Sequence, residues 1–156
     1  CGGLTLPAVV DSRLQTPVES KLVQTACEVP TVIACDEVRI RSDAASRLRA
    51  LGMEMIGFPS IGGDLPLDAL LRELVAKHDV THVLVEAGVG LMTRLFRQRL
   101  ANEAWVFTAP MNVGDDQALP NVRGMLDNAH MTLWSRRQRG GDVIARYCVH
   151  SMGSTG

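Results

Sequence analysis

Three short stretches of the sequence place polar side chains or glycines directly after an apolar run. The first is Asp11-Ser12-Arg13, which offers a hydroxyl, a guanidinium and loop amides. Such groups can hold a phosphate, because each donates hydrogen bonds to an anionic oxygen. An Asx turn followed by a solvated arginine explains the same three residues. The residues alone leave both interpretations open.

The second stretch runs from Glu86 to Thr93 and contains Gly88 and Gly90 just before a helical pattern. Small residues leave the backbone amides accessible at the start of a helix, where the helix dipole favours an anion such as a pyrophosphate. The position three after Gly90 is Thr93, so the GxGxxG motif is not completed. A tight turn without a ligand remains the alternative. Glu86 can accept a hydrogen bond from a substrate donor group, or it is a solvated acid.

The third stretch is Ala34-Cys35-Asp36, whose backbone could line an adenine or ribose pocket, although nothing in it is specific. Cys35 lacks the partners of a catalytic nucleophile, and a buried inert thiol is the favoured interpretation. His78 and His82 are four residues apart, but Asp-Val-Thr between them indicates a helix-to-strand junction rather than one helical face. We therefore predict no metal site, and no catalytic residue is identified.

Apolar patterns and turn residues predict the elements that position these stretches. Alternating or continuous apolar runs predict strands over residues 6–10, 31–35, 53–58, 82–86, 104–109, 131–135 and 143–149. Helical spacing predicts helices over residues 42–51, 67–75 and 91–100, with Ser42 capping the first and Gly52 closing it. A polar loop is expected over residues 112–121, and Gly140-Gly141 suits a hairpin turn.

Strands that alternate with helices predict a parallel sheet, because each crossover needs a helix to return the chain. The expected fold is α/β: a three-layer α/β/α domain whose mostly parallel mixed sheet ends in a C-terminal antiparallel hairpin. One domain over residues 1–150 is predicted, followed by a flexible tail over 151–156. Ligands bind beyond the carboxyl ends of the strands in such sheets, which is where all three stretches are expected.

Composition excludes several classes of function. The net charge is −1, and its 16 basic and 17 acidic residues are spread along the chain. The sequence has no basic block of the kind that would predict nucleic-acid binding. The apolar runs are far too short to span a membrane. Four cysteines form no CxxC pair, and a chain of this size needs no disulfides, so a cytoplasmic location is predicted.

Three segments together resemble one family over nearly the whole chain. They are AVVDSRLQTPVESKLV, VLVEAGVGLMTRLFRQRLANEAWVFTAP and the terminal GGDVIARYCV, of which the central segment is the most specific. They are similar to the reductase domain of bifunctional riboflavin-biosynthesis deaminase-reductases. That domain is related in fold to dihydrofolate reductase, so the resemblance implies a dihydrofolate-reductase-like fold.

The resemblance also implies an activity and a cofactor. The reaction is the NADPH-dependent reduction of the ribosyl group of 5-amino-6-(5-phosphoribosylamino)uracil to a ribityl group. Ser12 and Arg13 would hold the NADPH phosphate, and Glu86 would touch the substrate. The pyrophosphate would be wrapped by Gly88, Val89, Gly90, Leu91, Met92, Thr93 and Arg94. Family members pair through this kind of domain, so a homodimer is expected.

One departure from the family pattern limits this assignment. Domains of the family begin with additional strands and a helix, which supply much of the pyrimidine and ribose-phosphate site, and the sequence lacks them. It also lacks the zinc-dependent deaminase signature HxE…PCxxC. We therefore expect an N-terminally truncated, NADPH-binding part of a longer protein that also carries a deaminase domain. The alternatives are a non-catalytic nucleotide-binding or assembly module of the same fold, and a dihydrofolate-reductase-like reductase of another heterocycle.

Overall fold

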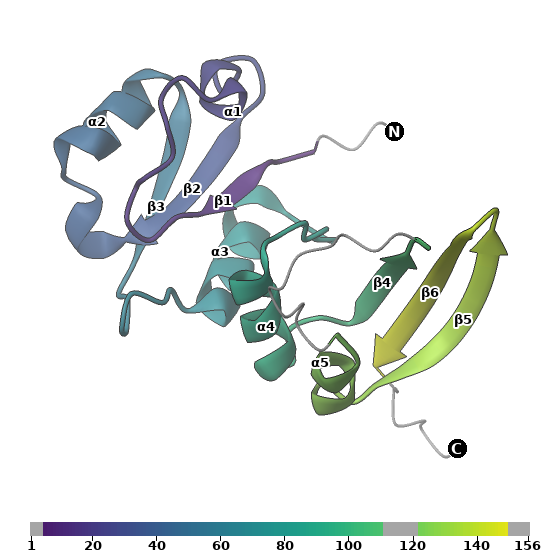
Figure 1. The fold of residues 1–156 in the computed structure, drawn as a ribbon. Helices are drawn as coiled ribbons and strands as arrows, with labels where there is room; N and C mark the ends of the chain where they lie inside the picture. Colours follow the sequence, from purple (N-terminus) through teal and green to yellow (C-terminus); the bar gives the residue numbers. More distant parts are fainter. Residues whose placement is uncertain (1–4, 111–121, 150–156) are drawn as a thin grey trace. The chain divides into compact units, whose positions relative to one another are not determined.

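The computed structural model describes residues 5–110 and 122–149 (Figure 1). The chain separates into two compact units, residues 1–81 and residues 82–156, whereas the sequence predicts one domain over residues 1–150. Each unit is described by itself below. The loop predicted over 112–121 and the tail predicted over 151–156 lie outside the described residues.

The first unit is built on a parallel sheet in the order β1-β2-β3. Its strands are β1 (Ala8–Val10), β2 (Thr31–Asp36) and β3 (Met53–Phe58). Their register aligns Val10 with Ala34 and Ala34 with Ile56. The first five residues of β2 are all buried, as expected for a central strand covered on both faces.

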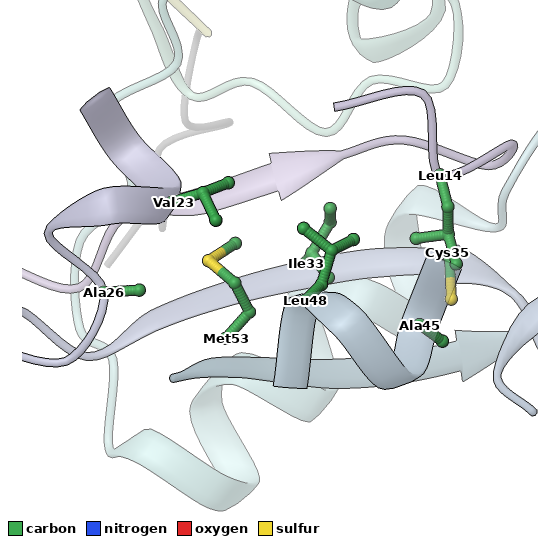
Figure 2. Packing of buried hydrophobic residues seen from close by; sticks show 8 residues of the cluster. All are labelled: Leu14, Val23, Ala26, Ile33, Cys35, Ala45, Leu48 and Met53. Carbon is green, nitrogen blue, oxygen red and sulfur yellow. The ribbon is translucent and has the colours of Figure 1, made fainter. Parts of the chain in front are cut away.

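Side chains of β2 alternate between two hydrophobic clusters, one on each face of this sheet. Ile33 and Cys35 belong to the first cluster, shown in Figure 2, which includes residues of α1 (Lys21–Gln24) and α2 (Asp43–Ala50). Val32 and Ala34 belong to the second, with Leu70 and Leu74 of α3 (Leu67–His78). Helices therefore cover both faces, which confirms the predicted α/β/α layering within this unit.

The ends of α2 follow the predicted signals. The Ser42 hydroxyl accepts a hydrogen bond from the amide of Ala45 at 3.2 Å, which caps the helix start. Gly52, just beyond the helix, has a φ of 91°, which a residue with a side chain rarely adopts. Two elements were not predicted, α1 and the 3₁₀ turn η1 (Glu37–Arg39), because three or four residues are too few to show a helical period.

The second unit places two helices against an antiparallel sheet in the order β4-β6-β5. Its elements are α4 (Val89–Arg97), β4 (Glu103–Thr108), α5 (Val122–Asn128), β5 (Met131–Arg139) and β6 (Asp142–Val149). Phe96 of α4 and Leu126 of α5 are the centre of its core, with Met131 of β5. The predicted terminal hairpin is confirmed, but its strands are longer, so the turn shrinks to Gly140-Gly141. Helix α5 was missed.

The strand predicted over residues 82–86 is wrong. No strand forms there, and the side chains of Val83 and Leu84 are 48% and 85% exposed. An apolar run indicates a tendency to be buried, but a strand also needs a neighbouring backbone to complete its hydrogen bonds. The ladders of the described residues include none of these five. As a result the parallel and antiparallel strands form two three-stranded sheets, whereas the sequence predicts a single mixed sheet.

Replacing Gly52 by alanine is expected to destabilise the protein more than the same change at Gly62. Both glycines have positive φ, so each alanine costs about 1–2 kcal/mol of backbone strain. A Cβ at Gly52 would also lie 2.9 Å from the backbone nitrogen and the sulfur of Cys27, whereas a Cβ at Gly62 meets nothing within 4 Å. Relieving such a clash typically costs a further ~1–3 kcal/mol. Urea unfolding followed by circular dichroism measures both free energies; equal losses would contradict the close approach at Gly52.

Candidate functional site

The carboxyl edge of the parallel sheet gathers one polar residue from the end of each strand. The amide of Asp36, the last residue of β2, donates a 3.2 Å hydrogen bond to the carbonyl of Ser12, which follows β1. The hydroxyl of Ser60, which follows β3, donates to the Asp36 carboxylate. Ser12, Asp36 and Ser60 are all half-buried. This edge is the part of an open α/β sheet at which ligands bind.

The turn that carries Ser12 and Arg13 is held by the carboxylate of Asp11. That carboxylate accepts hydrogen bonds from the Arg13 amide at 3.3 Å and from both the amide and the hydroxyl of Thr16 at 2.7 Å. Leu14 adopts a φ of 54° and buries its side chain in the first cluster. The Asx turn considered from sequence is therefore formed, and Arg13 is exposed. The same turn keeps Ser12 at the sheet edge, so an Asx turn and a phosphate-binding role for these residues are compatible.

Asp36 is held in its ionised form. The hydrogen bond from Ser60 lowers the pKa of this carboxyl below its ordinary value, and the Val38 amide and the charge of Arg39 act in the same direction. The Val38 amide donates to one carboxylate oxygen at 3.1 Å, so Asp36 also caps the short η1 turn. The sequence drew attention only to the backbone of residues 34–36. An acid that closes an apolar strand is a pattern that could have identified this side chain.

Cys35 is fully buried in the first cluster, as predicted for a structural cysteine. Burial is the main cause that raises the pKa of its thiol, and the nearby Arg49 opposes this rise. The thiol is the unreactive form of cysteine, because the thiolate is the nucleophile. Cys35 is therefore unsuited to nucleophilic catalysis.

In the second unit, the predicted glycine stretch forms the start of α4. Gly88 is the N-cap residue, with a φ of −64° and a ψ of 166°, and the helix begins at Val89. A Cβ at Gly88 or at Gly90 would meet nothing within 4 Å. The first N–H groups of a helix have no partner within it, and here they begin in an exposed, uncrowded segment. This geometry is that of an anion-binding helix start.

The later residues of the predicted stretch are less available. The Met92 amide donates to the Gly88 carbonyl at 3.2 Å, so the helical hydrogen bonding starts at Met92. The hydroxyl of Thr93 donates to the Val89 carbonyl at 2.7 Å. Leu91, Met92, Thr93 and Arg94 are half-buried, and Met92 packs against the core of this unit. The amides of residues 89–91 are therefore the part of the stretch best placed to meet an anion.

The predicted site residues fall into two groups. Ser12 and Arg13 belong to the first unit, where the Ser12 carbonyl is bonded to Asp36 and Asp36 to Ser60, while the Arg13 amide is bonded to Asp11. Glu86 and residues 88–94 belong to the second unit, and Glu86 is exposed two residues before the cap of α4. Asp36 and Ser60 are the residues that sequence reasoning missed.

Over residues 5–110 and 122–149 there is no group of three or more His, Cys, Asp or Glu side chains arranged to hold a metal ion. Over the same residues, no helix has both the length and the apolar character that crossing a membrane requires.

Comparison with known proteins gives consistent matches to one family. The model of the RibD C-terminal domain matches residues 5–145. The riboflavin biosynthesis protein RibD of Actinobacillus pleuropneumoniae is 30% identical over 148 residues, which cover 92% of this chain and 39% of that protein. The protein of the same name from Chlamydia trachomatis serovar D is 31% identical over 120 residues, covering 77% of this chain and 30% of its own length.

Solved structures support the same fold. Two forms of Acinetobacter baumannii RibD match with TM-scores of 0.66 and 0.67 at 20% identity, and both cover 90% of this chain and 36% of the other. The chain thus spans well under half the length of these relatives. The fold agrees with the dihydrofolate-reductase-like class implied by the resemblance. With the family model matched over residues 5–145, the chain belongs to the RibD C-terminal domain family.

Proposed function

We propose that the chain is the NADPH-binding part of a pyrimidine reductase of riboflavin biosynthesis. The reaction is the reduction of the ribosyl group of 5-amino-6-(5-phosphoribosylamino)uracil to a ribityl group. The observation that carries the proposal is the family match over residues 5–145. It is supported by the open start of α4, which suits an anion, and by the turn after β1, which carries a hydroxyl and a guanidinium.

NADPH supplies the hydride when it is bound, so the residues of this chain need only bind and orient. Ser12 and Arg13 hold the phosphate that distinguishes NADPH from NADH, through a hydroxyl and a guanidinium on a turn fixed by Asp11. The amides at the start of α4, with residues up to Arg94 behind them, hold the pyrophosphate. Glu86 contacts the substrate.

Several finer features belong to the same proposal. The working protein is a cytoplasmic homodimer whose full length includes a deaminase domain, and residues 1–150 form its reductase-like domain. Pairing is supported by aromatic side chains on β4 and β5 of the second unit: Trp105, Phe107 and Trp134 are 56%, 69% and 71% exposed. Exposed aromatic side chains on one sheet are typical of surfaces that contact another protein.

Replacing Ser12 by alanine tests the phosphate contact. Losing a hydrogen bond to a charged group costs about 1.5–3 kcal/mol, so the Kd for NADPH should rise roughly tenfold or more. The Kd for NADH should stay the same, because NADH lacks the extra phosphate. Fluorescence titration of the purified chain with each nucleotide measures both constants. Ser46→Ala is the control, because Ser46 is an exposed serine on α2 whose hydroxyl donates to the Ser42 carbonyl. If Ser12→Ala raises the Kd for NADPH and the Kd for NADH by the same factor, Ser12 does not contact the phosphate that distinguishes them.

Replacing Gly90 by aspartate tests the start of α4 without harming the fold. A Cβ there meets nothing within 4 Å, and an acid in the first turn of a helix stabilises it by about 0.3–1 kcal/mol. The same negative charge repels a pyrophosphate, so the Kd for NADPH and for NADH should both rise roughly tenfold.

The isosteric Gly90→Asn variant is the control, since it adds the same volume without the charge. It should bind both nucleotides far better than the aspartate variant does. Thermal unfolding by circular dichroism verifies that both variants are folded. If a folded Gly90→Asp variant binds both nucleotides as tightly as the unchanged chain, the start of α4 is not the pyrophosphate site.

A further inference from the structure

The sheet edge that presents Ser12 also presents a carboxylate. The Asp36 amide contacts the Ser12 carbonyl at 3.2 Å, so the two residues are immediate neighbours on adjoining chain segments. A ligand that reaches the Ser12 turn therefore meets the end of β2 as well. Asp36 is half-buried, which leaves part of its side chain accessible from solvent.

The Asp36 carboxylate is held in place from two sides. The Val38 amide donates to one of its oxygens at 3.1 Å, and the Ser60 hydroxyl donates to the other. Each oxygen of an ionised carboxylate has two acceptor sites, so both oxygens can accept one more hydrogen bond. The carboxylate is thus fixed, charged and still able to accept a hydrogen bond from a hydroxyl.

Charges of both signs consequently border the same turn, whose own acid, Asp11, is already bonded to the Arg13 amide and to Thr16. Arg13 is exposed on it and favours an anion, whereas Asp36, whose backbone amide is bonded to the turn at Ser12, carries a negative charge that disfavours one. A fixed acid at the end of a strand is also the device by which dinucleotide-binding folds accept a hydrogen bond from a ribose hydroxyl. A phosphate on that hydroxyl replaces the donor by a negative charge, which turns an attraction into a repulsion.

We propose that Asp36 is a specificity-determining residue that accepts a hydrogen bond from the adenosine ribose and opposes a phosphate in its place. It narrows the preference for NADPH over NADH that Ser12 and Arg13 create, so that the chain binds both nucleotides. This inference rests on the proposed function, because it assumes that a nicotinamide dinucleotide reaches this edge of the sheet.

The test replaces Asp36 by asparagine in the full chain and measures the Kd for NADPH and for NADH. Asparagine caps helix starts as well as aspartate does, so η1 keeps its cap while the charge is lost. The ratio of the NADH constant to the NADPH constant should rise on the order of tenfold, chiefly through tighter NADPH binding. Asp43→Asn, which removes one exposed charge from the first turn of α2, should leave the ratio unchanged.

A structural role for Asp36 predicts a different result. Loss of a purely structural contact would weaken the binding of both nucleotides by the same factor. The ratio of the two Kd values would then stay unchanged, which would overturn the proposal. If Asp36→Asn does not fold, Asp36→Ser removes the charge and retains a good capping residue. The same rise in the ratio is expected for it, and an unchanged ratio would again count against the proposal.

A second pair of ligands separates this inference from the proposed function. Adenosine 2′,5′-bisphosphate and adenosine 5′-monophosphate differ by the same phosphate and carry no nicotinamide. If the chain binds neither dinucleotide but Asp36→Asn still shifts the ratio between these two ligands, the reductase assignment fails and the role of Asp36 stands. If neither ratio responds to Asp36→Asn, including through a lack of any binding, the role of Asp36 is refuted.

Discussion

The parallel alignment of β1, β2 and β3 is the constraint on which the first unit depends. Burial of β2 on both faces forces a helical layer onto each side, since Val32 and Ala34 point into one cluster while Ile33 and Cys35 point into the other. Helices on both faces are also the means by which parallel strands are connected. Because all three strands run the same way, the residues that follow them meet at one edge, where Ser12 contacts Asp36 and Asp36 contacts Ser60. The site is therefore a consequence of strand direction.

Patterns that repeat within one element were read correctly from the sequence. The spacing of Leu67, Leu70 and Leu74 predicts α3, and the apolar run after Pro30 predicts β2, because burial on one or two faces leaves its period in the chain. In the segment 82–86 the same kind of pattern predicts a strand that does not form. Its run of Val83, Leu84 and Val85 has the composition of a buried strand, but pairing depends on a partner elsewhere in the chain, and no local pattern specifies that partner.

The candidate site also contains some residues that a local sequence pattern reveals and others that only tertiary contacts bring together. Gly88 and Gly90 could be recognised because an accessible helix start has a local signature of small residues before a helical period. The contact between Asp36 and Ser60 could not, since it joins residues 24 positions apart through the register of β2 and β3. Asp36 was visible only as the end of a strand. Its fixed orientation comes from Ser60 and from Val38, and the first of these is a tertiary contact.

The two features proposed to bind phosphates use different chemistry, and the proposal gives them different tasks. The start of α4 offers backbone amides, which every residue except proline possesses, so it recognises a feature that all dinucleotides share. The turn after β1 offers the side chains of Ser12 and Arg13, and its backbone is bonded to that of Asp36; each of these side chains can change by a single substitution. Under the proposed function, affinity for the pyrophosphate is therefore a property of the fold. Under the same proposal, selectivity for one nucleotide over another depends on a few side chains at the edge of the parallel sheet, of which Ser12 and Arg13 lie outside the strands.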